Sequence, residues 1–122
     1  MAIEYKDILD SANRMLSSPS EVDQRNSISR AYYAAYHACH PVYDKLPMLA
    51  IEKTVKGGVH VKFISRFKHS VDIKVRQVGY ILAALHQKRC VADYEIHMDV
   101  EQSDAQLIYL QSQKAIDLAE KL

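Results

Sequence analysis

Residues that interrupt regular secondary structure are scarce in this chain of 122 residues. It has 3 Gly and 3 Pro, too few for the many tight turns of a β-sandwich or a small barrel. Alternation of apolar and polar residues, the pattern of a half-buried strand, is also absent. Trp is absent, whereas 8 Tyr are present, and several of them gather in one predicted helix. These absences favour a helical protein.

Long apolar runs are missing as well. The longest one, Tyr80 to Leu85, is far too short to span a bilayer. Residues 1–7 lack the basic start and apolar core of a signal peptide. The two cysteines, Cys39 and Cys90, are expected to be buried free thiols in a reducing compartment. We therefore expect a cytoplasmic protein that does not enter the membrane.

The net charge of +1 hides an uneven distribution along the chain. Residues 52–90 hold nine Lys or Arg and two acids, whereas residues 91–122 hold two Lys and seven acids. A basic middle and an acidic end are compatible with an anionic ligand at the middle, or with a partner that binds both the positive and the negative region. The alternative is a pair of solvated helix faces that meet each other.

Apolar residues at helical spacing predict an all-α fold. The expected helices cover about residues 3–16, 20–44, 59–69, 72–95 and 99 or 103 to 122, with a short helix within 48–55. Pro41 is expected to kink the second helix or to end it near His40. In the last helix, Leu107 and Leu110 are predicted to face the core. The chain is thus predicted to be a single domain over 1–122, an up-and-down bundle of four to five helices.

The second predicted helix carries two stripes of residues. One is apolar and predicts a core face: Ile28, Tyr32, Ala35, Cys39 and Val42. The other is turned away from it: Asn26, Arg30, Tyr33 and His37. Arg30 and His37 are close to two turns apart, about 10 Å along the axis. The second stripe is a candidate functional site.

Arg30 and His37 are the candidate catalytic residues on this stripe. An imidazole that titrates near neutral pH can take or give a proton, and a guanidinium can hold a phosphate by paired hydrogen bonds. Together they are the minimum needed for metal-free RNA cleavage, with Asn26 and Tyr33 as substrate contacts. The alternative is a plain surface stripe in which Tyr33 packs on a neighbour.

Arg89 is predicted to lie on the apolar side of the fourth helix. A buried guanidinium needs a partner, and Asp93, one turn later, is the obvious local one. Arg89, Asp93 and Tyr94 therefore form either a structural clamp between helices or the second half of a phosphate site. In the third helix, Lys62 and Arg66 are predicted to share an outer face with His69 and to contact an RNA backbone.

No metal or cofactor is expected. The histidines and cysteines lack the spacing of a zinc site, and Gly57-Gly58 lacks the patterns of phosphate-binding loops.

Two segments of the chain resemble the HEPN family of helical domains. They are Ser29-Arg30-Ala31-Tyr32-Tyr33-Ala34-Ala35-Tyr36-His37-Ala38 and, later, Arg89-Cys90-Val91-Ala92-Asp93-Tyr94. The second is similar to the family's R-x-x-A-D-Y element. His60 before Phe63 and Phe67 is similar to its third-helix pattern. The likeness extends over roughly residues 5–120.

This resemblance implies a bundle of four or five helices that forms a homodimer. Many HEPN proteins are metal-independent endoribonucleases of toxin–antitoxin and phage-defence systems, and their motif is Arg, four to six residues, then His. Arg30 and His37 match this spacing. Other members are non-catalytic modules that bind a partner, such as a minimal nucleotidyltransferase or another antitoxin, or a nucleotide. Both functions, RNA cleavage or binding and partner binding, stay open at this stage.

Overall fold

The computed structural model describes residues 2–122, and every regular element in this range is helical. The fold is an all-α bundle of five α-helices and one 3₁₀ turn, as the sequence predicts. The elements are α1 (Tyr5–Met15), α2 (Glu21–Lys45), η1 (Ala50–Lys53), α3 (Val59–Lys68), α4 (Ile73–Tyr94) and α5 (Gln102–Glu120).

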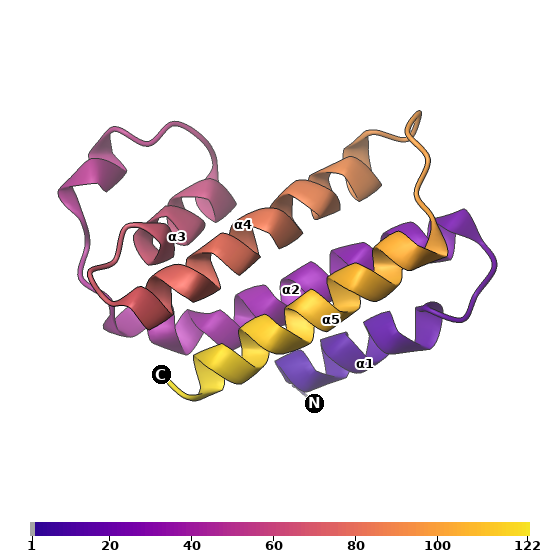
Figure 1. Ribbon diagram of the computed structural model, residues 1–122, viewed down its shortest axis with the longest axis horizontal. Coiled ribbons are helices and arrows are strands. Elements are labelled where there is room, and N and C mark those ends of the chain that lie inside the picture. The colour runs from indigo at the N-terminus through magenta and orange to yellow at the C-terminus, as the bar shows by residue number, and fades with distance from the viewer. Residues whose placement is uncertain (1) are drawn as a thin grey trace.

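Helix α2 is the centre of the bundle and packs against α1, α4 and α5. Figure 1 shows α4 and α5 running alongside each other, with α2 behind them and α1 beside the lower edge of α5. The short helix α3 packs on α4, away from α5, and η1 lies beyond it. The second stripe of α2, with Asn26, Arg30, Tyr33 and His37, therefore lies between α1 on one side and α3 and α4 on the other.

The apolar stripe of α2 is buried as predicted. Ile28, Tyr32, Ala35, Cys39 and Val42 all belong to one core cluster. Two buried hydroxyl groups from small side chains link the helices around it. Ser27 Oγ donates to the carbonyl of Ala12 at 2.8 Å, and Ser112 Oγ donates to the carbonyl of Ala31 at 2.6 Å. These bonds satisfy buried polar groups while the backbones of α1, α2 and α5 stay close.

Of the two alternatives expected at Pro41, a kink in α2 or an end near His40, the end does not occur. The helix continues through Pro41 to Lys45. Pro41 is exposed, so the carbonyl of His37 that loses its i+4 donor can turn to solvent. Packing of Val42 and Tyr43 on the core supports the last turn, and this tertiary contact overrides the local preference.

Helix α5 is rotated relative to the predicted one. Leu107 and Leu110 were predicted to face the core, but their exposed fractions are 52% and 61%. The core face is instead set by small and branched residues, among them Ala105, Ile108, Ser112 and Ala115. The error arises because α5 has apolar residues around most of its circumference, which leaves its inner face ambiguous in sequence.

None of the helices in residues 2–122 combines the length and apolar character needed to cross a membrane.

Candidate functional site

The polar stripe of α2 lies on the surface, as predicted. Asn26, Arg30 and His37 are exposed, and Tyr33 is half-buried. The Arg30 guanidinium carbon lies 5.1 Å from the centre of the Tyr33 ring. This cation–π contact places the guanidinium of Arg30 over the Tyr33 ring. The structure therefore leaves Arg30 and His37 open to solvent on one face, with an aromatic ring between them.

The Tyr33 hydroxyl connects this stripe to α4. Arg89 Nη1 donates to the Tyr33 hydroxyl at 3.0 Å and lies 3.5 Å from Asp93 Oδ2. Ser29 Oγ, on α2, donates to the same carboxylate at 3.3 Å. The prediction that Arg89 is buried and paired with Asp93 is confirmed. The resulting network holds α2 and α4 together, and it fixes the orientation of the Tyr33 ring.

Aromatic faces complete the surroundings of Arg89. Its guanidinium carbon lies 5.5 Å from the ring centre of Tyr32, 5.4 Å from that of Tyr33 and 5.8 Å from that of Tyr94. Its Nε atom is buried without a hydrogen-bond partner among the residues described. Tyr94 is otherwise exposed, so its ring covers the guanidinium from the solvent side.

Two histidines that the sequence did not assign to the site lie next to this network. The His60 Nδ1 atom and the Tyr32 hydroxyl share a hydrogen bond of 2.7 Å. The rings of His60 and His86 stack with centres 5.7 Å apart, and His86 Nε2 lies 3.6 Å from the Cys90 Sγ atom. Periodicity could have placed His86 one turn before Arg89 and Cys90, but nothing local in the sequence brings His60 to this group.

Burial and positive charge lower the pKa of both histidines. For His60 and for His86, loss of solvation is the main cause, and the nearby Arg89 guanidinium adds to it. The Tyr32 hydroxyl has its pKa raised, again mainly through burial. At neutral pH this cluster therefore holds neutral imidazoles beside a permanent cation.

The predicted outer face of α3 is only partly correct. Lys62 and His69 are exposed, but Arg66 is buried. Arg66 Nη2 lies 2.9 Å from Glu52 Oε1, and its Nε donates to both carboxylate oxygens at 3.1 and 3.2 Å. These bonds lower the pKa of Glu52, and the guanidinium stacks on Tyr43 at 4.2 Å. The expectation that Arg66 contacts RNA is therefore wrong, because its charge is already used to fasten η1 to α3.

His37 and the Arg89 network lie on different sides of the α2 stripe. His37 borders a shallow hollow that the N-terminal part of the chain forms, with Ile3, Lys6 and Ile8 among its lining residues. The Arg89 network lies on the side of Tyr33 that faces α4. Within residues 2–122, no group of three or more His, Cys, Asp or Glu side chains is arranged to hold a metal ion.

Comparison with models of known protein families, with curated proteins and with solved structures finds no match to this chain.

Proposed function

We propose that this chain is a HEPN-type protein that binds RNA and cleaves it without a metal ion, and that it acts as a cytoplasmic homodimer. The observation that supports this most directly is the joint exposure of Arg30 and His37 on one face of α2, with Tyr33 between them. A buried stripe of the same helix anchors that face in the core. The stripe is therefore accessible to solvent and supported by the core.

In the proposed reaction, the imidazole of His37 takes the proton of a ribose 2′-hydroxyl. The 2′-oxygen then attacks the adjacent phosphorus, and the bond to the 5′-oxygen breaks. The guanidinium of Arg30 stabilises the charge that develops on the phosphoryl oxygens. A second His37, from the other copy, protonates the departing 5′-oxygen. The products are a 2′,3′-cyclic phosphate and a 5′-hydroxyl.

Lysines on the basic middle of the chain supply the backbone contacts in this proposal. Lys62 and Lys74 are exposed, and neither makes an ion pair among the residues described. Phosphate contacts of this kind make affinity fall steeply with salt, because binding releases counterions. Asn26 and the Tyr33 ring are the contacts closest to the proposed reacting groups.

The test is incubation of the purified protein with a mixed RNA pool in EDTA, followed by analysis of product ends. We expect 2′,3′-cyclic phosphates from the unchanged protein and loss of cleavage in His37→Ala and Arg30→Met. His40→Ala, on the same helix, and Arg14→Met, on α1, are the matched controls and should retain activity. Absence of cleavage by folded protein, or equal cleavage by His37→Ala, would overturn the catalytic proposal.

A second candidate is a non-catalytic HEPN module that binds a partner protein, such as a nucleotidyltransferase. The exposed Leu107 and Leu110, about one turn apart on α5, favour it, because contiguous apolar surface marks interaction sites. Leu107→Ser with Leu110→Ser should then abolish capture of that partner and leave the fold intact. If the unchanged protein and this variant cleave RNA equally well, the cleavage does not depend on a partner bound at Leu107 and Leu110.

A further inference from the structure

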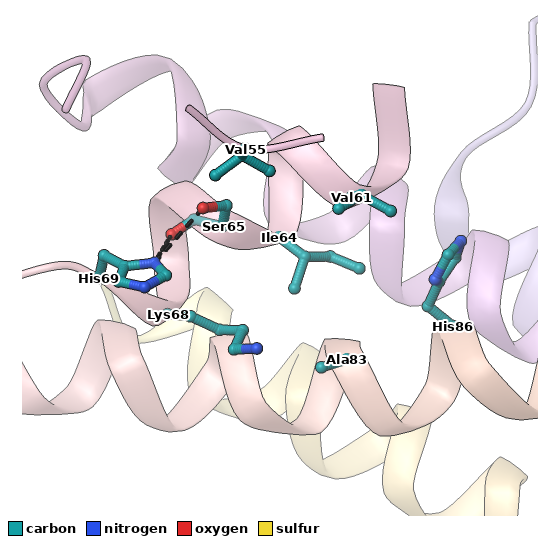
Figure 2. A pocket seen from close by; sticks show the side chains of 8 residues that line it. All are labelled: Val55, Val61, Ile64, Ser65, Lys68, His69, Ala83 and His86. Carbon is teal, nitrogen blue, oxygen red and sulfur yellow. Dashed lines mark hydrogen bonds between the residues drawn. The ribbon is translucent and has the colours of Figure 1, made fainter. Parts of the chain in front are cut away.

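A hollow between α3 and α4 lies apart from the α2 stripe. Its volume is about 230 Å³, and its walls are mainly apolar, with Val55, Val61, Ile64 and Ala83 facing it. Figure 2 shows Val55 and Val61 on one side and Ala83 on the other, with Ile64 between them. Val55 comes from the segment between η1 and α3, so three separate parts of the chain build the hollow.

One charged side chain reaches into these apolar walls. Figure 2 shows Lys68 extending beneath Ile64, with its ammonium group directed toward Ala83. Lys68 is half-buried and makes no ion pair among residues 2–122. Its Nζ atom lies 5.9 Å from the centre of the Tyr80 ring. A half-buried ammonium group is stabilised by an ion pair with a bound anion. An anion with an apolar body can also contact the apolar walls of the hollow.

The other polar groups at the rim do not compete for that role. His69 Nδ1 is 3.0 Å from the carbonyl oxygen of Ser65 at one end of the hollow. His86 closes the opposite end, where burial keeps its imidazole neutral at pH 7 by lowering the pKa. Glu52, three residues before Val55, has both carboxylate oxygens on Arg66. Among residues 2–122, no carboxylate lines the hollow, so Lys68 has no anionic partner there and only the Tyr80 ring near its ammonium group.

We infer that this hollow between α3 and α4 binds a small monocarboxylate with an aromatic or branched apolar body, held by Lys68. The apolar body covers Val61, Ile64 and Ala83, and the carboxylate pairs with the ammonium group. The volume lies below the range of sites for drug-sized ligands, which limits the ligand to a single ring or a short branched chain. This site is independent of the proposed RNA function.

A carboxylate fits better than a phosphate. A phosphate monoester brings close to two negative charges at pH 7 and needs several donors, whereas the hollow offers one ammonium group and mainly apolar surface. The second charge would lose its hydration without compensation. Neutral amides of the same shape lack the ion pair and should bind much more weakly.

The test uses benzoate as the probe, with amide resonances followed by NMR and affinity measured by calorimetry. We expect saturable shifts centred on Val61, Ile64 and Ala83, little response to benzamide, and weaker binding of phenyl phosphate than of benzoate. Lys68→Met should weaken benzoate binding at least fivefold. Lys88→Met, an exposed lysine of α4 that does not line the hollow, is the matched control and should bind normally.

Filling the hollow gives a second, charge-independent test. Ala83→Leu places a larger side chain in the cavity and should abolish benzoate binding, while thermal unfolding shows that the variant is folded. Absence of saturable shifts with the unchanged protein would overturn the inference. So would equal affinity in Lys68→Met, or tighter binding of phenyl phosphate than of benzoate.

Discussion

At the scale of single residues, three buried arginines are satisfied in three different ways. Arg25 donates to backbone carbonyls, Arg66 pairs with Glu52, and Arg89 is surrounded by a carboxylate, a phenol and aromatic faces. The last arrangement is the least complete, because one Arg89 nitrogen has no partner. Removing any further partner of Arg89 should therefore be costly.

Asp93→Asn tests this directly. It removes the negative charge beside Arg89 while keeping the shape of the side chain. Because the Asp93 side chain is about one quarter exposed, solvent screens part of the effect, and we expect a loss of about 1 kcal/mol in the free energy of unfolding. Asp44→Asn removes the exposed i,i+4 partner of His40 and should change little. Equal effects of the two changes in urea unfolding would contradict this view.

The two half-buried histidines, His60 and His86, predict a dependence of stability on pH. The folded-state pKa of His60 and of His86 lies below the ordinary 6.5, so the unfolded chain binds more protons at mildly acidic pH. Stability is thus complete above about pH 6.5 and falls as the pH drops from there toward the folded-state pKa values. Thermal unfolding between pH 7.5 and 5.5 should show this decline.

A variant isolates the histidine contribution to that decline. His86→Gln removes one titrating group from the cluster and should flatten the fall in unfolding temperature. His97→Gln changes an exposed histidine in the α4–α5 connection and should leave the slope as it is. If the unfolding temperature of His86→Gln falls with pH as steeply as that of the unchanged protein, His86 does not contribute to the pH dependence.

At the scale of elements, the end of α4 depends on a side chain from α2. Arg25 Nη1 donates to the carbonyls of Val91 and Ala92, at 3.3 and 3.0 Å, and Nη2 donates to the carbonyl of Met98. The carbonyl of Ala92 is one that a helix end leaves without an internal partner. The carbonyl of Val91 also accepts from the Glu95 N–H, and Met98 lies in the loop after α4. A cation placed there also interacts favourably with the helix dipole. Arg25 thus terminates α4 and holds the following loop.

Arg25→Met should therefore destabilise the protein by about 2 kcal/mol, since it removes several charge-assisted hydrogen bonds to buried carbonyls. Hydrogen exchange should accelerate first at the last turn of α4. Glu21→Gln is the control: it removes the half-exposed ion-pair partner of Arg25 and leaves the carbonyl contacts. If Glu21→Gln costs as much as Arg25→Met, the ion pair rather than the cap is the stabilising contact.

The contact between α3 and α4 depends on a glycine. A Cβ atom on Gly79 would lie 2.6 Å from the backbone nitrogen of Lys68 and 2.8 Å from the carbonyl carbon of Phe67. Gly79→Ala should thus cost about 1–3 kcal/mol through overpacking, despite a gain of about 1 kcal/mol in helix propensity. Gln77→Ala, an exposed position of α4, should be neutral or slightly stabilising. Stabilisation by Gly79→Ala in urea unfolding would contradict the close approach.

At the scale of the whole molecule, the buried residues form one core that every α-helix joins. Such a core predicts a single cooperative unfolding transition. Far-UV circular dichroism reports the helices, and near-UV signals report the packing of Tyr32, Tyr33 and Tyr36, since the chain has no Trp. The two signals should coincide throughout a urea titration. An earlier loss of the near-UV signal would show that the aromatic cluster opens separately.

The sequence predicts the helices well because their signals are local. The stripe from Ile28 to Val42 repeats with the helical period, and burial of Arg89 follows from the same period in α4. Arg66 and Leu107 could not be placed in this way. Burial of Arg66 requires Glu52, fourteen residues earlier in an irregular segment, and exposure of Leu107 depends on the rotation of α5 against α2.

The candidate site shows the same division. Exposure of Arg30 and His37 follows from their place opposite the apolar stripe of α2. Contact between His60 and Tyr32 follows only from the docking of α3, which brings residues 28 positions apart within hydrogen-bond distance. Periodicity within one helix carries no information on which helix docks beside it.

The two cysteines have unequal surroundings, and this makes the protein convenient for spectroscopy. Cys39 is buried, and burial raises the pKa of its thiol to about 12, so it resists alkylation. Cys90 is half-buried, one turn after His86 and next to Arg89. A thiol-reactive fluorophore should therefore attach at one position without any engineering of the chain. That single label would sit beside the Arg89 network and report changes there on binding.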